Sequence, residues 1–257
     1  MQLENKVVVI TGAGSGIGAA MARRFSEEST AGMMLADLNT ESVATVAEEI
    51  GAAHFQLDVS DPSANRVLIE TTEELFGPVD LFCANAGYGV AGSEQSDPDG
   101  WDKMWGVNVM AHVHAARNLV PGWLARGRGY FLSTASAAGL LTNLGAAEYS
   151  VTKHAAVAFA EWLAVSYGDK GVKVSCLCPQ FVNTPLIEAM SELDTLISTA
   201  AVLEPQAVAD AVVDGLAEER FLILPHPEVE QYLQNKAGDY DRWIEGMQKL
   251  QRVVFPE

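Results

Sequence analysis

Residues 7–25, VVVITGAGSGIGAAMARRF, place a glycine-rich turn between an apolar strand and a helix. The glycines have the spacing G-x-x-x-G-x-G, with a fourth glycine, Gly14, inside it. Such a turn lets the backbone come close to a pyrophosphate and directs free N–H groups and the helix dipole at it. A glycine cluster alone is also typical of a plain tight turn, so the interpretation depends on residues further along the chain. The predicted cofactor-binding residues of this turn are Gly12, Ser15, Gly16, Ile17 and Gly18.

An acidic residue lies at the distance that a dinucleotide site requires. Asp37 ends the apolar run GMMLAD (32–37), 19 residues after Gly18, close to the roughly 20 residues expected of the acid that binds a ribose 2′-hydroxyl. A carboxylate at this place repels a 2′-phosphate, and the next residue, Leu38, is not basic. The pattern therefore favours NAD over NADP and adds both residues to the predicted cofactor site.

Apolar runs of strand length recur along the chain, with segments of helical period between them. Most are apolar throughout, which is typical of parallel strands covered on both faces. The alternation predicts an α/β fold, a single-domain Rossmann fold with a doubly wound, seven-stranded parallel sheet and helices on both faces. Asp58 and Val59, at the end of the third run, are predicted to border the adenine. The alternative is that Asp58 is only a polar residue at the end of a strand, and the two interpretations are equally favoured. The predicted strands are residues 6–11, 32–37, 53–58, 79–84, 129–134, 172–178 and 220–224.

Two regions interrupt this alternation within the one domain predicted for residues 1–257. Residues 180–204 form a connection far longer than the usual two to six residues, which predicts a substrate lid. Residues 226–257 form a predicted helical tail in which Trp243, Met247, Leu250 and Val254 recur at helical spacing, a pattern typical of packing against the body or a partner subunit.

The composition narrows the classes of partner. The 257 residues are 49% apolar and carry a net charge of −18, which disfavours nucleic acid and anionic membranes, since both need a basic surface. No secretory signal or membrane-spanning run is evident, and the three cysteines lack zinc-like spacing. The five histidines show no metal-ligand spacing either. We expect a cytoplasmic protein with reduced core cysteines and no metal site.

Several motifs appear in the order found in one enzyme family. A Tyr and a Lys at the spacing Y-x-x-x-K come 13 residues after a Ser, and an Asn-Ala-Gly comes directly after the fourth apolar run. With the glycine turn, these motifs make the chain, from about residue 4 to about residue 224, resemble the short-chain dehydrogenase/reductase family, which implies a Rossmann fold and hydride transfer with NAD. The motif residues are Thr11, Gly12, Gly16, Gly18, Asn85, Ala86, Gly87, Asn108, Ser136, Tyr149 and Lys153.

The chemistry accounts for the residue types at the catalytic positions. Tyr149 and Lys153, four residues apart, lie on one face of a helix, and a phenol with a pKa of about 10 needs a nearby positive charge to act as a base at neutral pH. By the resemblance, Lys153 also holds the nicotinamide ribose, Ser136 orients the substrate oxygen, and Asn108 holds a water of a proton relay.

The remaining site residues come from the resemblance. Asn85, Ala86 and Gly87 match the segment that steadies the central strand and lines the adenosine side. The stretch CPQFVNTPL resembles a Pro-Gly segment that holds the nicotinamide carboxamide, and Pro179, Val182 and Thr184 fit it. Gln180 stands where the family usually has glycine; this departure alters the backbone beside the nicotinamide, puts an amide into the substrate pocket, or turns a side chain to solvent.

The expected substrate walls are mostly apolar and contain no Arg or Lys. A neutral, hydrophobic secondary alcohol or ketone of aryl, alicyclic, steroid or terpenoid type fits them best, and phosphorylated or acyl-carrier substrates lack an evident clamp. A sugar or polyol dehydrogenase and a catalytically idle NAD-binding interaction module stay open as alternatives. The expected walls are residues 88–93 and 139–145, Ser136, Tyr149, Gln180, Leu186, Ile187 and Met190.

Quaternary structure is predicted from two helices. Those beginning near Trp101 and Tyr149 resemble the pair that joins family dimers and tetramers, so we expect a homo-oligomer. Ala155, Ala156 and Ala160 permit close helix contact there, unless they face the sheet. The C-terminal tail either blocks a tetramer interface or covers the active site.

Overall fold

A parallel sheet forms the centre of the computed structural model, which describes residues 1–188 and 201–256. The strands are in the order β3-β2-β1-β4-β5-β6-β7. Strands β1 to β3 extend the sheet to one side, and β4 to β7 extend it to the other side of β1. The switch in strand order thus lies between β1 and β4, and in a doubly wound fold the ligand crevice lies at the carboxyl ends of these two strands. The strands are β1 (Val7–Thr11), β2 (Gly32–Asp37), β3 (Ala53–Gln56), β4 (Leu81–Ala84), β5 (Gly129–Thr134), β6 (Val172–Leu177) and β7 (Leu222–Ile223).

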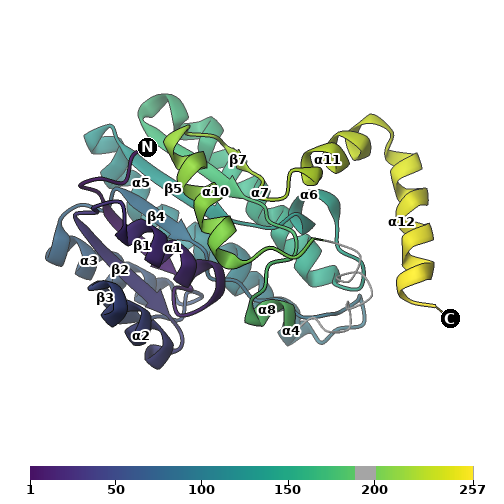
Figure 1. Cartoon of the computed structure of the whole chain (residues 1–257), viewed down its shortest axis with the longest axis horizontal. Coiled ribbons are helices and arrows are strands. Elements are labelled where there is room, and N and C mark those ends of the chain that lie inside the picture. The colour runs from purple at the N-terminus through teal and green to yellow at the C-terminus, as the bar shows by residue number, and fades with distance from the viewer. Residues whose placement is uncertain (189–200, 257) are drawn as a thin grey trace.

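Helices cover both faces of this sheet, as Figure 1 shows. One face packs on α1 (Gly16–Ser26), α2 (Thr40–Ile50) and α10 (Pro205–Ala217), and the other packs on α3 (Pro62–Phe76), α5 (Ala111–Arg126) and α7 (Ala147–Tyr167). Every residue of β1, β4 and β5 is buried, which explains their uninterrupted apolar sequences. The predicted fold class is confirmed.

The strands are shorter than predicted at several ends. The third run ends its ladder at Gln56, opposite Asp37 of β2. The last run pairs with β6 at Leu222 and Ile223. Apolar sequence continues beyond the paired residues because Leu57, Phe221 and Leu224 still pack in the core. Strand ends therefore depend on the partner strand and not on the hydrophobic run.

Shorter elements surround the carboxyl edge of the sheet. A π-helical turn (Gly106–Met110) joins α4 to α5, and a 3₁₀ turn (Gly168–Lys170) comes after α7. The lid predicted for residues 180–204 includes α8, while its residues 189–200, with the expected wall residue Met190, lie outside the described part of the chain. The remaining helices are α4 (Pro98–Trp105), α6 (Ala138–Leu141), α8 (Pro185–Glu188), α11 (Glu228–Gly238) and α12 (Tyr240–Val254).

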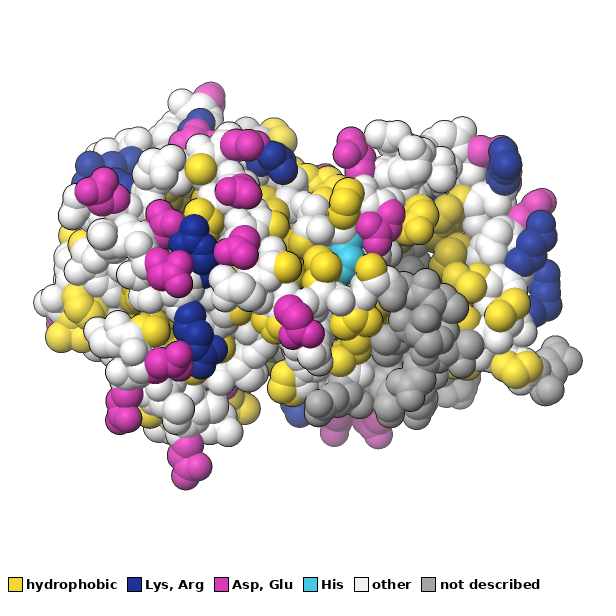
Figure 2. Space-filling view, in the orientation of Figure 1, with side chains coloured by type: hydrophobic (Ala, Val, Ile, Leu, Met, Phe, Trp, Pro, Cys, Tyr) yellow, Lys and Arg dark blue, Asp and Glu magenta, His cyan; other side chains and the backbone are white. Residues whose placement is uncertain are grey.

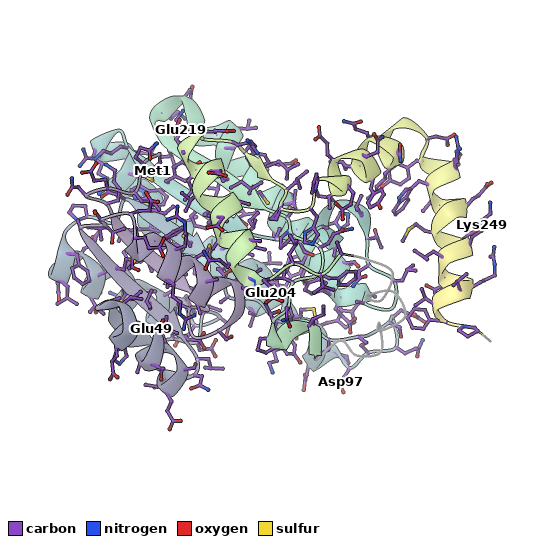
Figure 3. All side chains as sticks on the ribbon, viewed as in Figure 1. Met1, Glu49, Asp97, Glu204, Glu219 and Lys249 are labelled. Carbon is purple, nitrogen blue, oxygen red and sulfur yellow. The ribbon has the colours of Figure 1, made fainter. Side chains whose placement is uncertain are left out.

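The chain ends in two helices that stand beside the body, here called the C-terminal arm (residues 226–256; Figure 1). Extended backbone at Asp239 separates α11 from α12, and the Asp239 carboxylate accepts a hydrogen bond from the Arg242 N–H as the cap of α12. Apolar side chains gather on the side of α12 that faces the body, and basic ones lie on its outer side (Figure 2). Lys249 points outward (Figure 3).

Within the described residues, no helix combines the length and the apolar character needed to cross a membrane.

Candidate active site

A cavity of about 930 Å³ lies at the carboxyl ends of the strands. It is lined by all of the predicted catalytic and cofactor-binding residues except Asn108. Of the two predicted wall segments, only residues 88, 89 and 141–144 line it. The nucleotide and catalytic halves of the prediction, far apart in the sequence, therefore face one continuous space. The predicted residues that line it are Gly12, Ser15, Gly16, Ile17, Gly18, Asp37, Leu38, Asp58, Val59, Asn85, Ala86, Gly87, Ser136, Tyr149, Lys153, Pro179, Gln180, Val182, Thr184 and Leu186.

The glycine turn after β1 has no room for side chains. Gly12 and Gly16 have φ angles of +65° and +51°, a region that disfavours other residues. A Cβ on Gly18 would lie 2.0 Å from the Gly12 carbonyl oxygen. Ser15 is the cap residue of α1 but makes no side-chain capping bond, so the first N–H groups of this helix remain available for an anion. The turn fits a pyrophosphate.

Asp37 is held in place at the end of β2. One of its carboxylate oxygens accepts a hydrogen bond from the Gly14 N–H at 2.9 Å, and the other accepts one from the Asn39 N–H at 3.0 Å. Each carboxylate oxygen has a further lone pair for a ribose hydroxyl. The adjacent Leu38 side chain is 68% exposed. The Asp37 carboxylate is thus held in one orientation at the cavity wall. Its neighbour Leu38 is apolar and supplies no positive charge for a 2′-phosphate.

Hydrogen bonds join the ends of β1 and β4 below the cavity floor. The Thr11 hydroxyl accepts from the N–H groups of Asn85 and Ala86 at 3.0 and 3.1 Å. The Asn85 side-chain amide donates to the Thr11 carbonyl at 3.0 Å. This connection fixes the segment up to Gly87, which lines the cavity beside Lys153.

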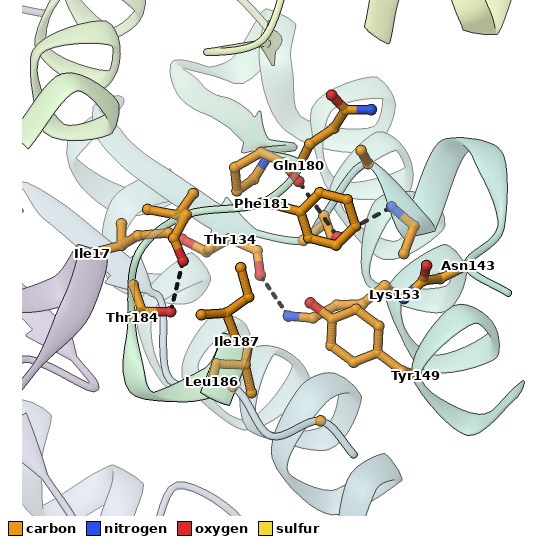
Figure 4. A pocket seen from close by; sticks show the side chains of 18 of the residues that line it. Ile17, Thr134, Asn143, Tyr149, Lys153, Gln180, Phe181, Thr184, Leu186 and Ile187 are labelled. Carbon is orange, nitrogen blue, oxygen red and sulfur yellow. Dashed lines mark hydrogen bonds between the residues drawn. The ribbon is translucent and has the colours of Figure 1, made fainter. Parts of the chain in front are cut away.

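Three side chains form the catalytic end of the cavity. Tyr149 and Lys153 lie in the first two turns of α7, and the Lys153 ammonium is 5.7 Å from the centre of the Tyr149 ring. It donates a hydrogen bond to the Thr134 carbonyl at 3.1 Å, as Figure 4 shows. Ser136, in the loop after β5, accepts from the Ala138 N–H and donates a long bond of 3.4 Å to the Pro179 carbonyl.

The first turn of α7 is held by the loop before it. The Ser150 hydroxyl accepts a hydrogen bond from the Asn143 N–H at 2.9 Å and bonds to the Ala146 carbonyl. On the other side, a Cβ on Gly139 of α6 would lie 2.5 Å from the Lys153 carbonyl oxygen. Close packing of α6 on α7 thus depends on glycine, and it brings the Ser136 loop against the Tyr149 turn.

Burial sets the protonation of this cluster. Tyr149 is 7% exposed, and burial raises the pKa of its phenol, with the nearby Ser136 hydroxyl acting in the opposite direction. Burial lowers the pKa of Lys153 to about 8. Burial is thus the larger effect on the Tyr149 pKa, and the lowering of this pKa by Lys153 stays a prediction. At neutral pH Tyr149 is a phenol, the form that donates a proton to a carbonyl.

Asn108 lies behind this cluster and not on the cavity wall. It is in the π-helical turn, where its side chain accepts from the Tyr88 N–H at 2.9 Å and donates to the Tyr88 carbonyl and the Thr152 hydroxyl. The side chain thus joins the Tyr88 segment to α7. The water-holding role that the resemblance implies stays a prediction.

The segment after β6 reaches the glycine turn. Thr184 donates to the Val182 carbonyl at 3.2 Å, and a Cβ on Gly16 would lie 2.9 Å from the Thr184 methyl group. Gln180 has no positive φ, so its backbone needs no glycine. Its side chain points away from Tyr149 and Lys153 (Figure 4). The departure from glycine therefore places no amide between the catalytic side chains.

Part of the cavity wall was not predicted from the sequence. Lys103 of α4 lines the cavity, 4.5 Å from the centre of the Tyr88 ring. The predicted wall segments contain no Arg or Lys, but the cavity wall extends beyond them to α4, which no pattern in the sequence indicates. The sequence predicts an amphipathic C-terminal arm, and the structure places it along the cavity. The arm residues that line the cavity are Glu228, Tyr232, Asn235, Trp243, Met247 and Leu250.

All five histidines, as candidate metal ligands, lie in the part of the chain that the structure describes. In residues 1–188 and 201–256, no three His, Cys, Asp or Glu side chains are grouped as ligands for a metal ion. His112 instead forms a 3.0 Å hydrogen bond with Ser133, and burial lowers its pKa to about 3.

Comparison with known proteins decides the family. The family model for short chain dehydrogenases matches residues 6–195. The chain belongs to this short-chain dehydrogenase family. It is therefore an oxidoreductase with the family's NAD(P)-binding fold, and the resemblance inferred from the motifs is confirmed.

Relatives of the family match nearly the whole chain. A meso-2,3-butanediol dehydrogenase of Serratia marcescens is 36% identical over 85% of this chain and 90% of its own. A 1-deoxy-11-beta-hydroxypentalenate dehydrogenase of Streptomyces exfoliatus is 31% identical over 95% of this chain and 91% of its own. The crystal structure of a family member from Burkholderia phymatum in complex with NAD is 30% identical, has a TM-score of 0.86 and covers 94% of this chain and 96% of that one.

Proposed function

We propose that the protein transfers a hydride between NAD(H) and a neutral, hydrophobic secondary alcohol or ketone. The observation that carries this proposal is the continuity of the cavity. It extends from Asp37 past the glycine turn to Ser136 and Tyr149, and on to the apolar face of the arm. Dehydrogenases of alcohols among the relatives support the reaction, and the NAD complex of a similar structure supports the cofactor.

The chain's own residues supply positioning and a proton. When bound, the cofactor would supply the hydride acceptor (NAD) for alcohol oxidation or the hydride donor (NADH) for ketone reduction. Ser136 holds the substrate oxygen by a hydrogen bond, exchanging its long bond to Pro179 for a better acceptor. Tyr149 donates a proton to the ketone oxygen or removes one from the alcohol. Lys153 places a positive charge beside the phenol and favours its anion during alcohol oxidation.

A substrate panel tests this function. We expect NADH formation with alicyclic and multi-ring secondary alcohols, and poor turnover of sugars, polyols, and phosphorylated or acyl-carrier substrates. Of the two lysines in the described cavity wall, Lys103 lies against the Tyr88 ring and Lys153 donates to the Thr134 carbonyl, so neither is free to clamp an anionic group. Efficient use of a sugar would favour a polyol dehydrogenase. NAD binding without turnover of any alcohol or ketone would favour an idle NAD-binding module.

The arm is proposed to form the wall that contacts the body of the substrate. Trp243, Met247 and Leu250 face the cavity from α12, and the stripe they form with Val254 spans about 16 Å. Val254 is buried, and Phe255 packs on the cluster that contains Met104 and Tyr149. The stripe therefore crosses the cavity from one side to the other and suits a substrate larger than one ring.

Trp243→Ala is expected to raise the KM for multi-ring alcohols by about tenfold or more, because it removes a large apolar contact. The KM for cyclohexanol, which does not need the far wall, should change much less. Ile244→Ala is the matched control, since Ile244 is the next residue on α12, is 41% exposed and does not line the cavity. An equal effect of Trp243→Ala on both substrates in steady-state assays would contradict a role in substrate size.

Self-association is proposed to use an apolar stripe on α7. Ala156 and Ala160 are fully buried against the sheet core, so the alternative in which they face the sheet is correct for both. The outer face of the same helix presents apolar side chains at alternating intervals of four and three residues. These are Val151, Ala155, Ala158, Trp162 and Val165.

Trp162→Glu is expected to convert the dimer or tetramer into smaller species at micromolar concentration, because Trp162 and Val165 are 55% and 85% exposed in the single chain and a charge there opposes burial. Glu161→Gln, at the neighbouring exposed position, should leave the mass unchanged. Light scattering of both variants and the wild type measures this. A wild-type monomer, or a Trp162→Glu protein of unchanged mass, would contradict the interface.

A further inference from the structure

The peptide unit between Pro179 and Gln180 is bonded at both of its polar ends. Its carbonyl accepts hydrogen bonds from the Ala137 N–H at 2.8 Å and from the Ser136 hydroxyl. Its N–H, contributed by Gln180, donates to Nδ1 of His226 at 3.1 Å. The carbonyl and the N–H of one trans peptide point in opposite directions, so the His226 ring fixes the orientation of a carbonyl that the Ser136 loop uses.

His226 acts from behind the cavity. It is 1% exposed, does not line the cavity, and begins the C-terminal arm, where its carbonyl accepts from the Val229 N–H. An acceptor at Nδ1 requires a neutral ring with its proton on Nε2. Gln180 is the position at which this chain departs from the family glycine, and its N–H is the one that His226 binds.

We propose that His226 is a positioning residue for Ser136, acting through the Pro179–Gln180 peptide. If Nδ1 carried a proton, the ring N–H and the Gln180 N–H would both be donors at this contact and would repel each other. The peptide would then turn, and the Pro179 carbonyl would leave the Ala137 N–H, the bond that holds the Ser136 loop when the Ser136 hydroxyl turns to the substrate. This inference rests on the proposed function only for its kinetic consequences.

The surroundings of the ring keep it neutral at neutral pH. Burial lowers the pKa of His226, and the Glu228 carboxylate and the backbone carbonyls of Phe181 and Ala201 oppose this in part. Among the described residues, Glu228 is the charged group that faces the ring. Protonation therefore takes place below the ordinary histidine value of about 6.5. Activity should fall as the pH falls through the pKa of His226.

Two variants separate positioning from packing. His226→Leu removes the acceptor and is expected to lower kcat by about 10- to 100-fold, since small displacements of a catalytic group have effects of this size. His226→Asn places an oxygen near the Nδ1 position and should stay within about threefold of the wild type, without the acid limb that His226 produces. In a Ser136→Ala background, His226→Leu should add little, because the two residues act through one peptide.

The test has one part that needs no substrate. Nitrogen-15 NMR of the free, histidine-labelled full chain should show His226 as the tautomer with its proton on Nε2, titrating below the ordinary histidine value. A proton on Nδ1 at neutral pH overturns the inference whether or not an alcohol is turned over. Equal losses of kcat in folded His226→Leu and His226→Asn, or an undiminished effect of His226→Leu in the Ser136→Ala background, also overturn it. Failure of the proposed function would show separately, as wild-type protein without turnover.

Discussion

Tyr149→Phe is expected to lower kcat for both alcohol oxidation and ketone reduction by about 10³-fold, the typical contribution of a positioned acid or base. The substitution removes one oxygen from a ring that is 7% exposed and belongs to a buried apolar cluster with Met104 and Ala138, so the fold should persist. Stopped-flow or steady-state measurement of NADH absorbance gives the ratio. The affinity for NADH should change little, because the glycine turn and Asp37 are untouched.

Tyr167→Phe provides the matched control for this loss. It removes a phenol from the other end of the same helix, where the Tyr167 ring lies edge-on to Trp162 at 5.8 Å and does not line the cavity. Activity of this variant should match the wild type. A Tyr149→Phe enzyme that retains a tenth or more of the wild-type kcat would remove Tyr149 from the proton transfer and would point to another group in the cavity.

The double change Asp37→Ser and Leu38→Arg is expected to reverse coenzyme preference. The Asp37 carboxylate repels a 2′-phosphate, and an arginine at position 38 supplies the bidentate cation that a phosphate needs. We expect the ratio of kcat/KM for NAD to that for NADP to fall by about 10³-fold. NAD loses the hydrogen bond between its ribose and Asp37, while NADP is no longer repelled by the carboxylate and gains an ion pair with the arginine.

A control variant at a nearby charged residue tests whether the change in coenzyme preference depends on Asp37 itself. Glu41→Gln removes one negative charge from the first turn of α2, two residues beyond Asn39, without altering the cavity wall. Its preference for NAD should be close to that of the wild type. A similar preference for NADP in the wild type, or an unchanged ratio in the double variant, would contradict the assignment of NAD and of Asp37 as its determinant.

Much of the sheet and the glycine turn could be predicted because the signal is local. Val7 to Ile10 are all apolar because both faces of strand β1 are covered. The glycines come directly after this strand because no Cβ fits in the turn. The order of motifs along the chain then identified the family before any contact was known. These features depend on neighbours in sequence, which a single sequence contains.

The arm and the Gln180 backbone could not be predicted because their partners are distant in the chain. The stripe from Trp243 to Val254 indicates that one face of a helix is covered, but the same pattern serves a core, a partner or a cavity. Lys103 was missed for a similar reason, since nothing near α4 in the sequence indicates that it faces Tyr88. No local pattern predicts the role of His226, because its partner is a backbone N–H 46 positions away.

The central claim is hydride transfer from NADH to a cyclic ketone, and isotope transfer tests it most directly. The wild-type protein is incubated with a multi-ring ketone and NADH that carries deuterium at the transferable position, and the alcohol is analysed by mass spectrometry and NMR. We expect one deuterium per alcohol, on the carbinol carbon and in a single configuration, with Tyr149→Phe giving almost none of this product. Alcohol without deuterium at that carbon, or no alcohol from any ketone in the panel, would contradict hydride transfer by this protein.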